Sequence, residues 1–88
     1  MLTALNWVAV DSTVFTRAAY ARRKHQLYLE FHSGKVYRYF EFPAYQYDEF
    51  LAAESQGKYF RAHIRGQFRE EEVRAAQPRG KLIYFPRK

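Results

Sequence analysis

Two short stretches rich in apolar and aromatic residues, joined by a turn sequence, constrain this fold more than any other feature. In QLYLEF (26–31) the large apolar residues alternate and so share one face of a strand. HSG (32–34) favours a tight turn because Gly34 can adopt a left-handed backbone conformation. KVYRYFEF (35–42) supplies a second strand. The pattern predicts a β-hairpin.

The type of turn fixes how these two strands pair. A three-residue turn with a bulge, in which Gly34 is left-handed, sets Leu29 opposite Tyr37. Both tyrosines of the YRY run then share the apolar face and belong to the core, with their hydroxyls at its rim. The alternative, a two-residue turn at Ser33 and Gly34, would shift the register by one and bury Arg38. Burying an unpaired charge is costly, so the bulged turn is favoured.

Strand and helix signals elsewhere complete the pattern. STVFTRAAY (12–20) predicts another strand, and WVAV (7–10) could add a short edge strand. After a proline, PAYQYDEFLAAES (43–55) and SQGKYFRAHIRGQF (55–68) have apolar residues at helical spacing, and Ser55 can cap the second helix. Gly57 would let the chain turn between the helices. The expected fold is α+β: an antiparallel three- to four-stranded β-meander followed by two α-helices packed on one face.

The composition changes after Phe68. The last segment, REEEVRAAQPRGKLIYFPRK, begins with three acids that are typical of a solvated helix start. It ends in proline, glycine and basic residues. We expect one domain over 1–68 and a charged, partly flexible C-terminal extension over 69–88. Within the extension, the apolar run KLIYF (81–85) could add a strand or dock on a partner.

The residue content argues against several classes of protein. There is no cysteine, so disulfides and thiolate metal sites are excluded, and the three histidines lack metal-ligand spacing. We find no Gly-rich phosphate loop, nucleophile elbow or paired carboxylate motif, and therefore expect no enzyme, metal or cofactor. We also expect neither a secretory signal nor a membrane span, which favours the cytoplasm. The oligomeric state stays open.

Basic residues are the main functional signal. The formal net charge is +6, which raises affinity for polyanions. Four basic side chains follow helical spacing near the second helix, with no acid between residues 55 and 69. They are Lys58, Arg61, Arg65 and Arg69. Such a row could track phosphates or could simply be a solvated helix face. A second cluster occupies the turn before residue 26, at Arg22, Arg23 and Lys24, and a third lies in the tail.

The face of the sheet away from the helices carries aromatic residues as well. Tyr28, Arg38 and Phe40 could form a small platform on which bases stack. The alternative is that the N-terminal segment covers this face, with Trp7 packing there. We favour the covered arrangement, because a sizeable exposed aromatic patch is unusual without a partner.

The pattern VDSTVFTRAAY…LYLEFHSGKVYRYFEFP…YDEFLAAESQGKYFRAHIRGQF resembles the KTSC domain. This family is named for its occurrence at the C-terminus of some lysyl-tRNA synthetases and also occurs as small stand-alone bacterial proteins. The resemblance covers about residues 10–68, and Tyr37 and Tyr39 correspond to its central YxY. Ala18 departs from the pattern, where a larger aliphatic residue is expected. The resemblance implies no established activity. The occurrence of the domain in a tRNA enzyme suggests that it binds RNA.

Together these features predict a small non-catalytic binding module whose ligand is RNA. The resemblance suggests a tRNA-related RNA. Contacts would go mainly to phosphates, so sequence specificity would be weak. The candidate contact residues are Lys58, Arg61, Arg65, Arg69, Arg22, Arg23, Lys24 and Arg38. The alternative is a protein–protein adaptor that uses a sheet edge or the KLIYFP tail. A third hypothesis is a metal-free nuclease. Its acid–base groups would be His32 and His63, with Arg61 beside the phosphate.

Overall fold

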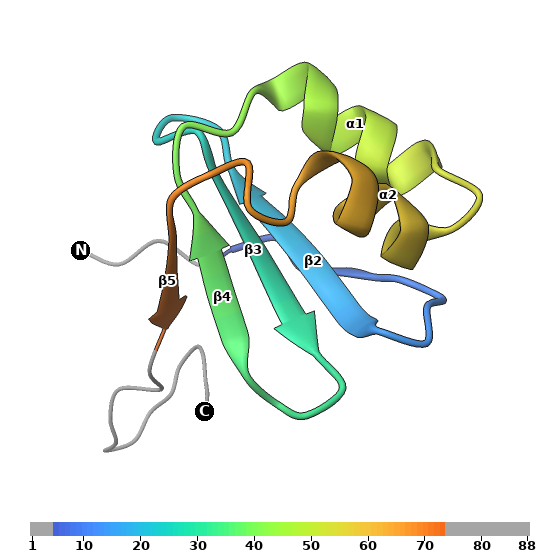
Figure 1. The fold of residues 1–88 in the computed structure, drawn as a ribbon. Coiled ribbons are helices and arrows are strands. Elements are labelled where there is room, and N and C mark those ends of the chain that lie inside the picture. Colours follow the sequence, from blue (N-terminus) through green and yellow to red (C-terminus); the bar gives the residue numbers. More distant parts are fainter. Residues whose placement is uncertain (1–4, 74–88) are drawn as a thin grey trace, which may run out of the picture.

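The protein folds into one antiparallel sheet with two helices on one of its faces (Figure 1). The structure is a computed structural model, and it describes residues 5–73. The elements in chain order are β1 (Val8–Ala9), β2 (Phe15–Ala21), β3 (Gln26–Phe31), β4 (Val36–Tyr39), α1 (Ala44–Ala52), α2 (Gln56–His63) and β5 (Glu70–Val73). The sheet order is β1-β2-β3-β4-β5, so each strand pairs with its neighbour in sequence. The predicted α+β class is confirmed.

The hairpin of β3 and β4 has the predicted bulged turn. Leu29 pairs with Tyr37 and Leu27 pairs with Tyr39. Gly34 has a φ of 95°, and its N–H donates to the Phe31 carbonyl at 2.8 Å. Glycine adopts this left-handed conformation without steric cost, which explains why the turn fixes the register.

The core lies between the sheet and the helices. Phe15 is fully buried, and its ring centroid lies 4.8 Å from that of Phe31, 5.8 Å from Phe50 and 5.2 Å from Phe60. Tyr39 is also buried, as predicted, whereas the other tyrosine of the YRY run is only half-buried. The phenylalanines of both helices therefore meet the sheet around Phe15.

The opposite face of the sheet, which we call the helix-free face, carries Arg17, Tyr28, Glu30, Val36 and Arg38. The register places these side chains away from the helices, because residues two apart on a strand share a face. Over the described residues this face borders the N-terminal segment that leads into β1 (Figure 1).

The second helix begins as predicted but ends sooner. The Ser55 hydroxyl accepts a hydrogen bond from the Lys58 N–H at 3.2 Å, which confirms the predicted cap. The helix ends at His63 rather than at residue 68, because Ile64 leaves helical geometry and Gly66 is left-handed, with a φ of 75°. Phe68 still packs against the core, from the segment that follows.

Gly57 lies within α2 and not at a turn between the helices, so the predicted role of this glycine is wrong. A Cβ atom at this position would lie 3.1 Å from a methyl carbon of Val14. Glycine is needed because the helix approaches the segment before β2 closely.

The acidic run after residue 69 forms a strand, and the predicted helix start is wrong. In β5, Glu70 pairs with Tyr39 and Glu71 pairs with Arg38. The Phe40 N–H also donates to the Arg69 carbonyl at 3.0 Å. Pairing with β4 and the opposite charge of Arg38 outweigh the weak strand propensity of glutamate. The sheet therefore has five strands, where the sequence predicted three or four.

The remaining predictions about the extension fall outside the described residues, including the KLIYF run and the basic residues near it. Over residues 5–73, neither helix has the length and apolar character needed to cross a membrane.

Candidate nucleic-acid interface

Three connecting segments meet at one end of the sheet and border an open groove of about 600 Å³. They are the β2–β3 turn, the β4–α1 link and the α2–β5 link, which lie close together in Figure 1. Backbone hydrogen bonds join these segments. The Phe42 N–H donates to the His25 carbonyl at 2.8 Å, and the Phe40 N–H donates to the Arg69 carbonyl at 3.0 Å. The residues that line this strand-end groove are Lys24, Gln26, Phe40, Glu41, Gln67, Phe68 and Arg69.

Two cations from distant parts of the sequence reach the strand-end groove. Lys24 is exposed on the β2–β3 turn, and Arg69 is exposed just before β5. The Arg69 guanidinium carbon lies 4.2 Å from the centroid of the Phe40 ring, and that of Arg38 lies 5.2 Å from the same centroid. Within the described residues, Arg69 has no carboxylate partner at ion-pair distance. Its charge is therefore held in place by an aromatic ring rather than neutralised.

A chain of polar contacts on the helix-free face ends at the groove. Arg38 forms an ion pair with Glu71, and its Nη1 lies 3.4 Å from the Tyr28 hydroxyl. That hydroxyl donates to Oε1 of Gln26 at 3.2 Å. Burial works against the charge of Arg38, but hydrogen bonds to Glu71 and Tyr28 raise its pKa above the ordinary value. The hydrogen bond from Tyr28 holds the side-chain oxygen of Gln26. The NH₂ group of the same amide is left as a donor at the groove.

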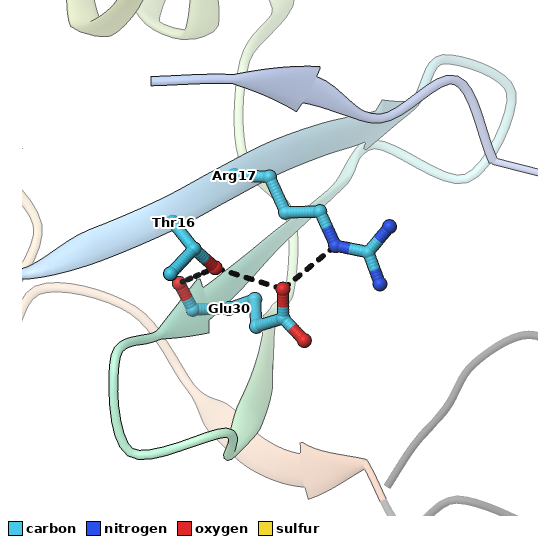
Figure 2. Close-up of polar contacts among 3 residues, drawn as sticks. All are labelled: Thr16, Arg17 and Glu30. Atoms are coloured by element: carbon cyan, nitrogen blue, oxygen red, sulfur yellow. Dashed lines mark hydrogen bonds and ion pairs between the residues drawn. The ribbon is translucent and has the colours of Figure 1, made fainter. Parts of the chain in front are cut away.

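The other end of the helix-free face is neutralised (Figure 2). Nε of Arg17 lies 2.7 Å from Oε1 of Glu30, and the Thr16 hydroxyl lies 2.8 Å from the same oxygen. The Arg17 guanidinium carbon also lies 4.3 Å from the Trp7 centroid, and Trp7 meets Tyr28 edge-on with centroids 6.4 Å apart. The expectation that Trp7 packs on this face is confirmed. Among residues 5–73, the guanidinium at this end belongs to Arg17 and is paired with a carboxylate, so we place the candidate interface at the groove.

Two residues beside the groove have strained backbones. His25 has a φ of 55° and Glu41 a φ of 54°, a region that costs L-residues other than glycine roughly 1–2 kcal/mol. The bond from Phe42 to the His25 carbonyl ties the two segments together. The strain is retained because it brings the turn and the β4–α1 link into contact.

Replacing Glu41 by glycine should stabilise the domain. Glycine removes the left-handed strain but adds freedom to the unfolded chain, so we expect a net gain of about 0.5–1 kcal/mol in the free energy of unfolding. Urea denaturation followed by circular dichroism measures it. Glu41→Ala loses the same carboxylate but keeps the strain, and should show no such gain. Equal free energies of unfolding for Glu41→Gly and Glu41→Ala would contradict a strained backbone at this position.

Residues 11–68 match the family model of the KTSC domain. The chain belongs to the KTSC family. The resemblance noted in the sequence is therefore confirmed, and its central YxY is the pair of tyrosines on β4.

Known proteins place the KTSC domain in two settings. The chain is 45% identical over 47 residues to a lysine–tRNA ligase of Nostoc sp., a match that covers 53% of this chain but 8% of that ligase. It is 35% identical over 60 residues to a protein of Tsukamurella paurometabola, covering 68% of this chain and 90% of the relative. The crystal structure of a KTSC domain protein from Yersinia pestis matches with a TM-score of 0.77 at 24% identity, over 80% of this chain and 99% of that one. This last likeness supports the fold.

The predicted basic row does not lie on one helix in this structure. Lys58 and Arg61 lie on α2, but Arg65 follows the end of the helix and Arg69 precedes β5. The prediction of a single helical stripe is wrong because the helix ends at His63. A guanidinium nitrogen of Arg61 would lie 3.7 Å from a Cβ atom placed on Gly57, so this side chain turns back toward the start of the helix. Arg69 instead lines the same groove as Lys24.

The second predicted cluster lies on the β2–β3 turn, where Arg22, Arg23 and Lys24 are all exposed. The Arg22 guanidinium carbon lies 5.6 Å from the centroid of Tyr20, a residue on the face that the helices cover. The cluster therefore extends from the groove toward α1. The third cluster lies outside the described residues.

The amide and acidic residues of the groove were not predicted as site residues. Gln26, Glu41 and Gln67 approach one another because β5 pairs with β4 and draws the α2–β5 link back over the end of the sheet. The sequence near residue 70 gave no signal for this pairing, because three consecutive acids are also typical of a solvated helix start. Over residues 5–73 no cluster of three or more potential metal ligands occurs.

The histidines considered for a nuclease lie on separate elements. Nε2 of His32, on the β3–β4 turn, is 2.8 Å from the Ser12 carbonyl oxygen. His63, at the end of α2, packs on the Tyr59 ring with centroids 4.7 Å apart. Each ring already has a structural contact of its own.

Proposed function

We propose that this KTSC domain is a non-catalytic RNA-binding module whose phosphate contacts are led by Lys24 and Arg69 at the strand-end groove. Arg22 and Arg23 extend the same surface. The observation that carries the proposal is the meeting of these two exposed cations in one groove, together with an aromatic ring. A positively charged groove with aromatic side chains is the usual arrangement for single-stranded nucleic acid.

Charge and relatedness support the same ligand. The net charge of +6 favours polyanions, and the related segment of a lysine–tRNA ligase makes a tRNA-related RNA the first ligand to test. Because phosphate contacts carry no base information, binding through these cations alone would discriminate weakly among sequences. Arg38 supports this surface indirectly. It is held by its ion pair with Glu71, and it contacts the Phe40 ring on which Arg69 lies.

Reversing the groove charges should remove most of the binding. We expect the double variant Lys24→Glu/Arg69→Glu to bind labelled single-stranded RNA roughly tenfold or more weakly in fluorescence anisotropy. The slope of log affinity against log salt should fall by about 1.4, from two phosphate contacts of about 0.7 each. Lys35→Glu makes the same kind of charge change on the exposed β3–β4 turn and should have little effect beyond net charge.

The residues of the predicted row need a separate test. Lys58→Glu/Arg61→Glu changes two exposed cations on α2, and Arg65→Glu changes the turn after it. We expect these variants to fold normally, since surface substitutions rarely cost much stability, and to weaken binding less than the groove variant. If the α2 variant lost binding and the groove variant did not, the interface would lie on α2.

The protein-adaptor hypothesis makes the opposite prediction about salt. An adaptor that adds a strand or docks the KLIYFP tail would hold its partner by backbone bonds and apolar contacts, so binding would resist salt. Negligible affinity for tRNA, single-stranded RNA and duplex at low salt would remove the RNA proposal and leave the adaptor. Cleavage of the RNA during the titration would contradict a non-catalytic role.

A further inference from the structure

We propose that the strand-end groove holds one unpaired nucleotide, with its base stacked on the Arg69 guanidinium that lies over Phe40 and its phosphate beside Lys24 and the N–H edge of Arg69. This rests on the RNA-binding function above and specifies the form of the ligand. It differs from phosphate tracking because it requires a flat surface, a polar edge and a cation in one place.

The flat surface is the pair of Arg69 and Phe40. A guanidinium carbon 4.2 Å from a ring centroid is close to stacking distance, so the planar group can lie over the ring. Unpaired bases stack on arginine guanidinium planes as well as on aromatic rings. Arg38 approaches the same ring with its guanidinium carbon 5.2 Å from the centroid, which limits how far the ring can move. The platform is therefore already assembled without ligand.

The polar edge is formed by the side chains of Gln26, Gln67 and Glu41. The Gln26 oxygen accepts from Tyr28, so its NH₂ group can donate to an acceptor on a base. Gln67 adds a second amide. Glu41 is the informative residue, because a carboxylate would repel a bare phosphate but can accept hydrogen bonds from the amino group of a base. The mixture of two cations, two amides and one acid fits a whole nucleotide better than a simple anion.

The nucleotide has to be unpaired. In a duplex both faces of each base are stacked and the pairing edge is occupied, and side chains cannot read the deep, narrow major groove of A-form RNA. The groove volume of about 600 Å³ lies within the range of about 300–1,000 Å³ typical of small-ligand sites. A loop, bulge or end of a folded RNA can supply such a nucleotide.

The decisive variant is Arg69→Lys, which keeps the charge but removes the flat guanidinium. We expect its affinity for a single-stranded RNA to fall roughly tenfold, the size of one lost stacking contact, with an unchanged salt slope. Its affinity for a duplex of the same sequence should stay as in the wild type. Phe40→Leu should act in the same way. Arg65→Lys is the matched control at an exposed position outside the groove, and should change nothing.

The outcomes distinguish the nucleotide site from the proposed RNA-binding function. Thermal melts followed by circular dichroism verify that each variant is folded, and Arg69→Lys is a mild change at an exposed residue. Suppose Arg69→Lys binds single strands as the wild type does, while Lys24→Glu/Arg69→Glu still weakens binding. The nucleotide site is then wrong and the phosphate surface stands. The nucleotide site is equally wrong if the wild type binds duplex as tightly as single strand. A wild-type protein that binds no RNA overturns both.

Discussion

Phe15→Ala should leave this domain largely unfolded at room temperature. The side chain is fully buried, and three phenylalanine rings from β3, α1 and α2 surround it at centroid distances of 4.8–5.8 Å. Removing such a ring leaves a cavity that β3 and the helices can close only partly, and typically costs about 3–5 kcal/mol. Folded domains have about 5–15 kcal/mol in total, and a small domain lies at the lower end.

Urea denaturation followed by tryptophan fluorescence and circular dichroism measures this loss. The control is Tyr45→Ala, which removes an aromatic ring of similar size from α1, where it is 65% exposed. That variant should lose less than about 0.5 kcal/mol, as exposed positions usually do. If both variants lost the same amount, the packing of both helices around Phe15 would be wrong. Phe15→Leu should lie between them, because it keeps most of the apolar volume.

The second large effect is unfolding at alkaline pH, led by Tyr39. Burial raises the pKa of this tyrosine above its ordinary value of 10.0, and Glu70 and Tyr37 add to the rise. In the unfolded chain the hydroxyl loses its proton near the ordinary value. The native state holds the proton to higher pH, so its stabilising effect is complete below about pH 10 and is lost as pH rises above it.

Other tyrosines act in the same direction. Burial raises the pKa of Tyr20 and of Tyr47, and burial together with a hydrogen bond to Glu49 raises the pKa of Tyr59 to about 12. We therefore expect these four tyrosines to ionise together with the loss of circular dichroism, in one cooperative transition above pH 10. Independent ionisation of each tyrosine in a folded protein would contradict this.

Tyr39→Phe isolates the main contribution. It keeps the buried ring and removes the ionisable hydroxyl, so the midpoint of alkaline unfolding should move to higher pH. Stability at neutral pH should change little, apart from small effects of the lost hydroxyl. Tyr45→Phe removes an exposed hydroxyl instead and should leave the midpoint where it is. An unchanged midpoint in Tyr39→Phe would assign the transition to other groups.

The parts of the fold that depend on neighbouring residues could be predicted from the sequence. The β3–β4 register followed from one glycine and from the cost of burying Arg38, and both are local arguments. Ser55 as a helix cap is equally local. The end of α2 was harder, because Arg65 and Arg69 continue the helical spacing of charges after the helix has ended. Charge spacing does not hold a helix together, and the left-handed Gly66 ends the periodicity.

The candidate site could not be predicted because it depends on one long-range pairing. Nothing near residue 70 in the sequence indicates that Glu71 faces Arg38, yet this pairing draws Arg69 and Gln67 to the turn that carries Lys24. A run of three acids has low strand propensity, so local preference pointed to a helix. Tertiary contacts decided otherwise. Two of the residues proposed for binding, Lys24 and Arg69, therefore line one groove, whereas the single helical stripe to which Arg69 was assigned does not form.

The acidic strand has a consequence for assembly. β5 is the last strand in the sheet order, and it presents Glu70, Glu71 and Glu72 in succession. A second copy that aligned its own β5 there would bring like charges directly opposite each other, which disfavours the growth of a continuous sheet between molecules. A polypeptide that extends the sheet at this strand would be favoured by lysine or arginine in the facing positions, as Arg38 faces Glu71 on β4. Within the described residues, the three consecutive glutamates thus disfavour one specific contact, the pairing of β5 with the β5 of a second copy.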